Sequence, residues 1–445
     1  MATSAARAHW SSRLAFILAA AGSAVGLGNI WKFPYITGVN GGGAFVAVYL
    51  VCIALVGMPI FIAELYIGRQ AQANVVRAFE VTHRPRTPWR FVGWMGLASA
   101  FLILSFYSVV GGWVLDFILR SVTNQFAGHS DAEIQGVLGT LFSNPLRQLF
   151  WHALFMAATV GIVVQGLNAG LERWNRILMP ALFVLLLLLL VRAVFLPGFG
   201  QALSFLFTPH TERLTAAGVL EAVGHSFFTL SLGMGAMITY GSYLRTSGEL
   251  TRTVLSVAAL DTLIALAAGV VIFSVVFTFG LEPGSGPTLM FQTLPMLFAK
   301  MPGGYLVSLA FFLLVGFAAL TSAISLLEVV VSYWVETHGT ARGRTALVVG
   351  GIVYLLGVLS ALSTNLLADV KLLGLTFFDL ADKLTSSVTL PLGGALISLF
   401  FGWVLGRRAV AEVVGERFAT PLLWTVRVLA PLGVLGMLIN GLSGW

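Results

Sequence analysis

Oxygen-bearing side chains lie beside glycine-rich interruptions in otherwise apolar stretches of this chain. Asn29 follows a run with three glycines, Thr229 precedes a run with two, and Thr321 and Ser322 are neighbours in a third apolar stretch. Hydroxyl, amide and carbonyl oxygens are the ligands that hard metal ions prefer. These residues therefore indicate a site for a cation such as sodium. For the Thr321–Ser322 pair, the alternative is hydrogen bonding to the backbone of its own helix.

Ionisable side chains inside apolar stretches cost free energy and are candidates for function. Those of this chain are Lys32, Glu64, Asp116, Asp261, Glu328, Asp379 and Asp382. Asp379 and Asp382 are three residues apart, so they share one face of a helix. For Asp116 and Glu64, the alternative is a helix end whose side chain reaches toward the membrane interface.

The amino-acid composition indicates that the chain is a membrane protein. Of the 445 residues, 58% are hydrophobic and only 10% are charged, whereas soluble domains carry about 25% charged residues. The chain has too few polar residues to cover a water-facing surface, so lipid must cover much of it. The net charge of +7 then reflects the enrichment of Lys and Arg in cytoplasmic loops rather than nucleic-acid binding.

The expected fold is an all-α membrane protein with eleven transmembrane helices. A spanning helix needs about 20 mostly apolar residues, and the apolar runs are long and do not alternate as strands do. The expected spans cover roughly residues 12–36, 41–68, 92–122, 148–166, 177–196, 220–244, 254–281, 304–335, 345–363, 376–406 and 421–442.

The first and sixth expected spans are interrupted in the same way, at Gly22–Asn29 and at Thr229–Gly235. Glycine costs roughly 1 kcal/mol in a helix interior, and paired breaks in corresponding helices are typical of transporters built from inverted repeats. We expect one transmembrane domain over 1–445, in the form of a 5+5 inverted repeat. Its parts are repeat one at about 12–196, repeat two at about 220–406 and an extra helix at about 421–442. The alternative is close helix packing through small residues.

The distribution of Lys and Arg residues predicts how the chain is oriented in the membrane. With the N-terminus in the cytoplasm and the C-terminus outside, most of the 25 Lys and Arg residues fall in cytoplasmic segments. The first apolar segment has no clear cleavage site, which favours a retained helix. The loop at 283–303 is then extracellular, and its two apolar stretches are compatible with a short re-entrant hairpin. Cys52 is the only cysteine, so no internal disulfide forms.

Several motifs closely resemble the neurotransmitter:sodium symporter family, to which bacterial leucine and hydrophobic-amino-acid transporters belong. They are Arg7-x-His9-Trp10-x-x-Arg13, Ala21–Tyr35 (AGSAVGLGNIWKFPY), Asn40–Phe45 (NGGGAF), Phe227–Gly235 (FFTLSLGMG) and Ala318–Ser322 (AALTS). The resemblance covers nearly the whole chain, and these motifs in this order are very specific. It implies a sodium-coupled symporter and not an enzyme.

The resemblance implies two sodium sites. The first would use the Ala24 carbonyl, Asn29, Thr229 and Asp261, completed by the substrate carboxylate. The second would use the carbonyls of Gly22, Val25 and Ala318 with the hydroxyls of Thr321 and Ser322. The implied substrate-binding residues are Ala24, Gly26, Ile103, Tyr107, Phe228, Thr229, Ser231, Met234, Ser325 and Leu326, with Tyr107 bonding the substrate carboxylate.

The resemblance also implies gates and a hinge. Lys32 and Asp382 would form the outer gate, where the family usually has Arg in place of Lys32. Arg7 and Glu336 would close the inner side. Trp10 and Tyr243 would lie near that inner pair. Gly170 and Pro180 match a Gly-x9-Pro pattern of the fifth helix, whose unwinding would let water reach the second sodium ion.

The glycine at position 26 indicates which class of substrate the chain binds. Monoamine carriers of the family have aspartate at this position to hold an amine that lacks a carboxylate. Gly26 leaves room for a carboxylate beside sodium, and the expected pocket is mainly apolar. The expected substrate is therefore a neutral hydrophobic or aromatic L-amino acid. Met234 is pliable enough to accommodate several side-chain sizes.

The positions that hold chloride in chloride-dependent relatives differ here. Tyr49 and Thr229 remain, but His225, Asp261 and Ala265 replace the Gln, Asn and Ser of that site. A fixed carboxylate repels chloride and supplies its charge, so we expect no chloride requirement. His225 and Asp261 also suggest proton antiport on the return step, with a structural hydrogen bond between them as the alternative.

Other classes of function fit the sequence less well. It contains no H-E-x-x-H, no P-loop and no persuasive Ser/His/Asp grouping for an enzyme. A channel needs a continuous polar pore, and an amino-acid-sensing receptor would need a signalling domain. The expected partners are a small amino acid, two sodium ions and the lipid bilayer of a bacterial inner membrane, with no nucleic acid. Whether the chain forms a homodimer stays open.

Overall fold

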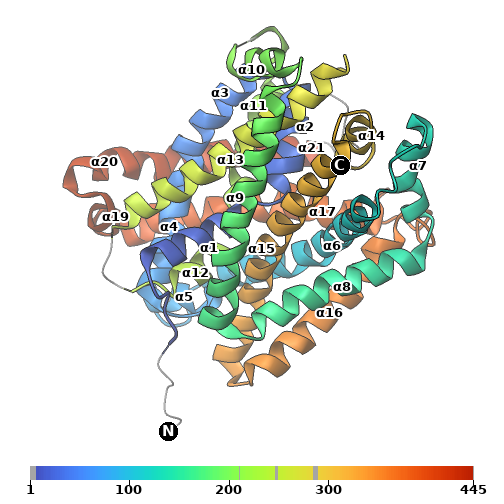
Figure 1. Cartoon of the computed structure of the whole chain (residues 1–445). Helices are drawn as coiled ribbons and strands as arrows, with labels where there is room; N and C mark the ends of the chain where they lie inside the picture. Colours follow the sequence, from blue (N-terminus) through green and yellow to red (C-terminus); the bar gives the residue numbers. More distant parts are fainter. Residues whose placement is uncertain (1–6, 210, 246–248, 284–288, 444–445) are drawn as a thin grey trace.

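The computed structural model describes residues 7–209, 211–245, 249–283 and 289–443 (Figure 1). Within these ranges the chain is helical, and its only β-pairings are two isolated bridges, Gly42 with Pro209 and Leu372 with Leu375. The all-α fold expected from the sequence is therefore confirmed.

The described residues contain nine helices long and apolar enough to cross a membrane, or ten if one bent pair counts as a single span. That bent pair is the expected first span. The sixth expected span is divided into α11 and α12, each shorter than a spanning helix. Together these segments correspond to the eleven expected spans, although several helices extend beyond the apolar runs.

The first five spans and their connecting helices occupy the first half of the chain. Their bounds are α1 Arg13–Ala24, η1 Gly28–Lys32, α2 Phe33–Val39, α3 Gly43–Cys52, η2 Ile53–Gly57, α4 Met58–Ala71, α5 Val75–Thr82, α6 Arg90–Val122, α7 Asp131–Phe142, α8 Pro145–Val163, η3 Leu167–Glu172, α9 Arg173–Val194, α10 Phe199–Phe207 and η4 Thr211–Arg213. The segments η1, η2 and η3 are wide π-helical turns, and η4 is a 3₁₀ turn.

The second half has the same general organisation. Its bounds are α11 Ala216–Thr229, α12 Ala236–Gly241, α13 Leu250–Thr278, η5 Leu289–Thr293, α14 Leu294–Ala299, α15 Gly304–His338, α16 Arg342–Leu362, α17 Phe377–Leu384, η6 Thr385–Thr389, α18 Leu390–Leu399, η7 Phe400–Leu405, α19 Gly406–Val414, α20 Glu416–Trp424, η8 Thr425–Leu429 and α21 Ala430–Ser443. In the loop expected at 283–303, the described part contains one apolar helical stretch, η5 with α14. Residues 284–288 of that loop, in the region of the expected hairpin, lie outside the described residues.

The two expected breaks are present. The axes of Arg13–Ala24 and Gly28–Val39 differ by 53°, and Val25 between them has extended backbone angles. The second break separates α11 from α12, and within it Ser231, Gly233 and Gly235 have positive φ angles of 54°, 80° and 75°. The left-handed region is strained for Ser231 but open to glycine. The glycines therefore let the chain leave the helical conformation between α11 and α12.

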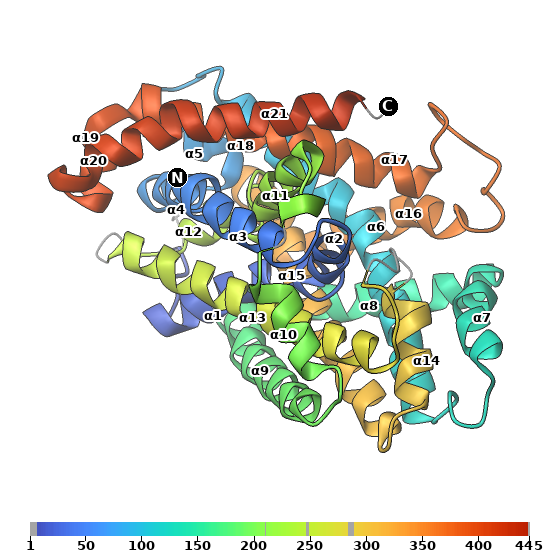
Figure 2. The same ribbon diagram turned by 90° about the horizontal axis from the view of Figure 1, so that it is seen from above.

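A long helix near the centre of the molecule, α15, packs against both interrupted spans. Seen from above, α15 lies near the middle of the molecule, α21 runs along the top edge of the view and α7 lies at its right-hand edge (Figure 2). Helix α15 contacts α6, α9 and α1. Its buried positions include Ala318, Ala319 and Ala323, and small side chains there let α1 approach closely.

Candidate functional site

The first break turns several backbone carbonyls toward Ser322 of α15. The Ser322 hydroxyl lies 3.4 Å from the Gly22 carbonyl oxygen, 3.2 Å from that of Ser23 and 3.3 Å from that of Val25. Thr321 donates to the carbonyls of its own helix, as the alternative interpretation anticipated. Ser322 instead reaches across to α1, so the residues expected at the second sodium site lie together.

The residues expected at the first sodium site also meet. The Asn29 amide nitrogen donates to the Thr229 hydroxyl at 3.0 Å and to Asp261 Oδ1 at 2.7 Å. Thr229 Oγ1 lies 2.9 Å from Asp261 Oδ2. All three residues are buried, and they come from η1, α11 and α13. The cluster contains four side-chain oxygens, two of which belong to the buried Asp261 carboxylate.

Glu64 supports the second break from the side of α4. Its Oε1 accepts a hydrogen bond of 2.7 Å from the backbone N–H of Gly233. Glu64 and Asp116 both have fully buried side chains, which does not favour the alternative that they reach from helix ends toward the interface. Asp116 pairs instead with Arg120 and Arg147, each at 2.6 Å.

A small cavity of about 30 Å³ lies between the two breaks. The expected substrate residues that line it are Ala24, Gly26, Ile103, Tyr107, Phe228, Ser231, Met234 and Leu326. Thr229 and Ser325 do not line it; Ser325 receives a hydrogen bond from Ser23 instead. The sequence analysis missed Ser23, Leu27 and Gly28 as lining residues, although each adjoins the glycine-rich run that marked the break.

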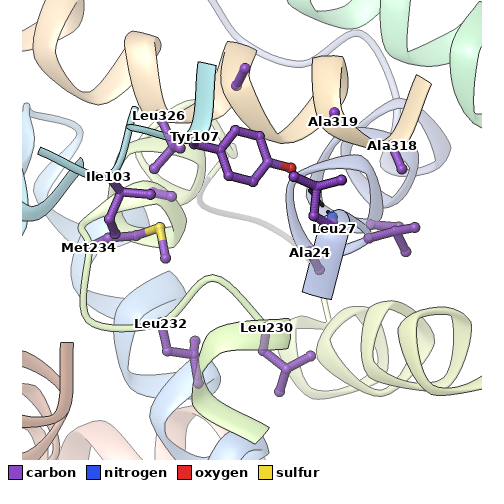
Figure 3. Close-up of a cluster of buried hydrophobic side chains, with 14 of the residues drawn as sticks. Ala24, Leu27, Ile103, Tyr107, Leu230, Leu232, Met234, Ala318, Ala319 and Leu326 are labelled. Atoms are coloured by element: carbon purple, nitrogen blue, oxygen red, sulfur yellow. Dashed lines mark hydrogen bonds between the residues drawn. The ribbon is translucent and has the colours of Figure 1, made fainter. Parts of the chain in front are cut away.

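One wall of this cavity is apolar and the other is polar. Figure 3 shows Ile103, Met234 and Leu326 on one side of the Tyr107 ring, with the Tyr107 hydroxyl directed toward Leu27. The Leu27 backbone nitrogen donates to that hydroxyl at 3.4 Å. A molecule bound here would have its polar end at the broken backbone of the first span and its side chain against the apolar wall.

The site needs glycine at position 26 because a Cβ atom would not fit there, and not because of the backbone angles. A Cβ atom added at Gly26 would lie 2.7 Å from Ser322 Oγ and 3.1 Å from the Tyr107 hydroxyl oxygen. Both distances are shorter than van der Waals contact. An aspartate at this position would therefore displace two polar groups of the site.

The inner gate residues are in contact. Arg7 forms an ion pair of 2.7 Å with Glu336, and its guanidinium lies 4.9 Å from the centre of the Tyr243 ring. The Trp10 indole nitrogen donates to the Tyr240 carbonyl at 3.0 Å. The segment that precedes α1 is thereby attached to α12 and α15.

Two further polar groups on this side were not assigned from the sequence. Buried Glu328 pairs with Arg342 and accepts a hydrogen bond of 2.6 Å from the Tyr243 hydroxyl. Glu172 pairs with Arg176 and accepts from the backbone and hydroxyl of Ser11. The Tyr243 and Ser11 partners are distant along the chain and leave no local pattern in the sequence.

The outer gate residues form no ion pair in the described part of the chain. The Lys32 ammonium lies 5.0 Å from the centre of the Phe228 ring, and Lys32 acts on Asp382 only as a neighbouring charge. The expected contact pair is thus absent in this structure. Lys32 also lines a second cavity of about 260 Å³ between α11, η6, α18 and α21.

The hydrogen bond between His225 and Asp261, which was the alternative to proton uptake, is also absent. Neither ring nitrogen of His225 has a hydrogen-bonding partner among the described residues. The ring packs against Phe33 and Tyr49, with centroid distances of 5.7 Å and 5.4 Å. Ala265 is fully buried in α13. His225 therefore packs as an aromatic ring here.

The two hinge residues lie in different parts of the fifth span. Gly170 belongs to the wide turn η3, and a Cβ atom there would lie 2.2 Å from the Ile162 carbonyl oxygen. Pro180 lies inside α9, where it removes a backbone donor. The start of this helix is therefore irregular, as the Gly-x9-Pro pattern indicated.

Comparison with known proteins agrees with this geometry. The chain is 39% identical over 438 residues to "Uncharacterized sodium-dependent transporter YhdH" of Bacillus subtilis, covering 97% of each chain. It is 33% identical to an uncharacterized sodium-dependent transporter of Haemophilus influenzae, covering 98% of each. Its structure superposes on the crystal structure of MhsT in complex with L-phenylalanine with a TM-score of 0.90 and 46% identity, covering 98% of this chain and 100% of that one.

The family comparison covers almost the whole chain. The model described as "Sodium:neurotransmitter symporter family" matches residues 7–133 and 145–444. The match includes both breaks and every residue of the two clusters described above. The chain therefore belongs to the sodium:neurotransmitter symporter family and is a sodium-dependent, multi-pass membrane transporter rather than an enzyme.

Proposed function

We propose that the protein couples the inward movement of two sodium ions to the uptake of one neutral hydrophobic or aromatic L-amino acid. The cavity between the two breaks carries this proposal, because an apolar wall faces broken backbone and the Tyr107 hydroxyl. An amino acid has this same division between a charged end and an apolar side chain. The L-phenylalanine bound by MhsT supports the same substrate class.

The first sodium ion would be bound with the substrate. Its ligands would be the Ala24 carbonyl, Asn29, Thr229 and Asp261, with the substrate carboxylate completing the set. The Asn29 nitrogen faces Asp261 here, so Asn29 offers its oxygen to an ion only when the amide turns over. Because ion and carboxylate complete each other's environment, neither binds well alone, and this dependence is the coupling.

The second sodium ion would bind between α1 and α15. Support comes from Ser322 Oγ, which lies within hydrogen-bonding distance of the Gly22 and Val25 carbonyls. Ala318 lies about one turn earlier on the same helix, and Thr321 directly precedes Ser322. An ion held there would tie the broken first span to α15, which is the contact that opening to the cytoplasm must weaken.

Chloride independence is part of the proposal. The Asp261 carboxylate belongs to the same cluster as Thr229 and provides a fixed negative charge. Proton counter-transport is a further element, in which Asp261 takes up a proton on the return step without a hydrogen bond to His225. Uptake that does not respond to a proton gradient would count against this element.

The transport cycle would follow alternating access in a bacterial inner membrane, with the N-terminus in the cytoplasm. The two breaks lie five spans apart, which supports two inverted five-helix repeats and an extra last span. The Arg7–Glu336 pair would close the cytoplasmic side. Lys32 and Asp382 would come together only when the outer side closes further.

The direct test is binding of radiolabelled phenylalanine, leucine and tryptophan to purified protein in sodium or potassium, with chloride or gluconate as the anion. We expect saturable binding that needs sodium and does not need chloride. Sodium-independent binding would overturn the two-site proposal. Sodium-dependent binding that also needs chloride would refute the role given to Asp261 and leave the transporter assignment intact.

A further inference from the structure

A buried amide oxygen on α9 has no partner. The Asn175 side chain is fully buried, and its nitrogen donates to the Leu171 carbonyl at 2.8 Å. Its Oδ1 has no hydrogen-bonding partner among the described residues. A buried polar atom left unsatisfied costs roughly 1–3 kcal/mol, so this oxygen calls for an explanation.

The unpartnered oxygen faces the first break. A Cβ atom added at Gly22 would lie only 2.3 Å from Asn175 Oδ1. The carbonyl of the same glycine lies 3.4 Å from Ser322 Oγ in the cluster between α1 and α15. Asn175 therefore presents an oxygen beside that cluster, from a helix that packs against both α1 and α15.

A carboxylate lies almost one turn earlier, at the last residue of η3. Glu172 and Asn175 are three residues apart, so they share a helix face. The Glu172 side chain is 6% exposed and pairs with Arg176 at 2.8 Å. It also accepts from the Ser11 backbone at 3.0 Å and from Asn168 at 3.1 Å. Glu172 thus lies where the segment before α1 contacts the wide turn η3.

We infer that Asn175 is a transient sodium ligand, which receives the second ion as it leaves the Gly22–Ser322 cluster and passes it to Glu172 and the cytoplasm. This inference rests on the proposed sodium coupling and extends it to residues outside the two sites. The ion is the only chemical species that moves, and no bond is made or broken covalently.

The chemistry of the two groups suits a release path. A neutral amide oxygen is a ligand for a hard cation but adds no charge that would retain it. Glu172 is balanced by Arg176, so it attracts the ion without trapping it. In this structure Ser11 donates hydrogen bonds to the Glu172 carboxylate. The ion therefore cannot reach this group until the segment before α1 moves away.

The local backbone supports such a movement. Gly166 has a φ of +88°, and the wide turn η3 follows it directly. This irregular start of the fifth span bears Asn168 and Glu172, the two side chains that contact the segment before α1. Loosening this turn releases both contacts at once.

The test compares two kinds of transport by reconstituted protein. Net uptake of labelled phenylalanine into sodium-free vesicles requires sodium to leave on the inner side, whereas exchange at equal sodium on both sides does not. For Asn175→Ala we expect net uptake to fall about fivefold, as expected for the loss of one polar contact with the ion. Exchange and equilibrium phenylalanine binding in sodium should stay within about twofold, which a merely misfolded protein would not achieve.

Two further variants sharpen the test. Asn175→Asp places a charge on the path and should make internal sodium inhibit net uptake at several-fold lower concentration. Gln165→Ala is the matched control, since Gln165 is an exposed amide nearby whose nitrogen bonds the Gly161 carbonyl, and it should behave like the original chain.

Unchanged net uptake by Asn175→Ala, or an equal fall in uptake and exchange, would overturn the inference alone. An original chain without sodium-dependent transport would overturn the proposed function and this inference with it.

Discussion

The Asn29 amide nitrogen lies 2.7 Å from the Asp261 carboxylate, although 232 residues separate the two along the chain. The contact joins the first broken span to the seventh span, directly behind the cavity. It also joins the two halves of the molecule. Any change in the charge of Asp261 therefore acts, through Asn29, on the Gly26 backbone that lines the cavity.

Asp261→Asn should weaken sodium-dependent amino-acid binding by at least about 30-fold, because truncating a buried charged partner costs roughly 2–5 kcal/mol. Added chloride should restore part of the loss, since an anion then replaces the missing carboxylate. The measurement is phenylalanine binding against sodium concentration, in chloride and in gluconate. Asp379→Asn is the control, because Asp379 is exposed at the start of α17. A variant that binds as tightly as the original chain without chloride would contradict the role given to Asp261.

Gly26→Ala should reduce phenylalanine affinity by about tenfold or more, because overpacking costs roughly 1–3 kcal/mol. The added methyl group meets Ser322 and Tyr107. Equilibrium binding in sodium measures the effect. Gly136→Ala is the matched control, since a Cβ atom at Gly136 has no neighbour within 4 Å. Normal affinity in Gly26→Ala would show that the cavity between the breaks is not the binding site.

Glu64→Ala should lower the apparent melting temperature and abolish substrate binding. It removes the acceptor of the Gly233 N–H and leaves that buried donor unsatisfied, at a cost of roughly 1–3 kcal/mol. Glu64→Gln keeps a carbonyl oxygen and should retain most of both properties. Thermal unfolding in detergent and phenylalanine binding test the pair. Equal losses in the two variants would show that the negative charge, rather than the hydrogen bond, is what α12 requires.

Glu336→Gln should weaken phenylalanine binding by up to about fivefold, because partly exposed ion pairs contribute about 0.2–1 kcal/mol. Without the charge on Glu336, Arg7 holds the segment before α1 less firmly. Hydrogen–deuterium exchange of residues 7–16 should rise in the same variant. Glu416→Gln, which alters an exposed pair with Arg407, should change neither property. Unaltered exchange at residues 7–16 would remove the Arg7–Glu336 pair from the inner gate.

The helices, the breaks and most of the cavity were predictable from the sequence, because they depend on local composition. A run of about twenty apolar residues predicts a spanning helix, and a cluster of glycines predicts a break in it. The family motifs add the residues that line the breaks. Gly26 and Tyr107 were found in this way.

The contacts that the sequence did not reveal are those between distant side chains. For Glu64 the sequence left open a helix end near the membrane interface, but its hydrogen-bonding partner is the backbone of Gly233, 169 residues away. Lys32 and Asp382 were paired by resemblance, yet Lys32 lies against Phe228 in this structure. Such contacts depend on the relative position of whole helices, which no local pattern encodes.

The segment before α1 takes its contacts from three later helices. Arg7 donates to Ser242, 235 residues farther along, and Ser11 donates to Glu172, 161 residues farther along. These residues leave the ribosome first, but their partners are synthesised much later. This segment therefore lacks its final contacts during the early steps of membrane insertion, and it acquires them only after α15 has been synthesised.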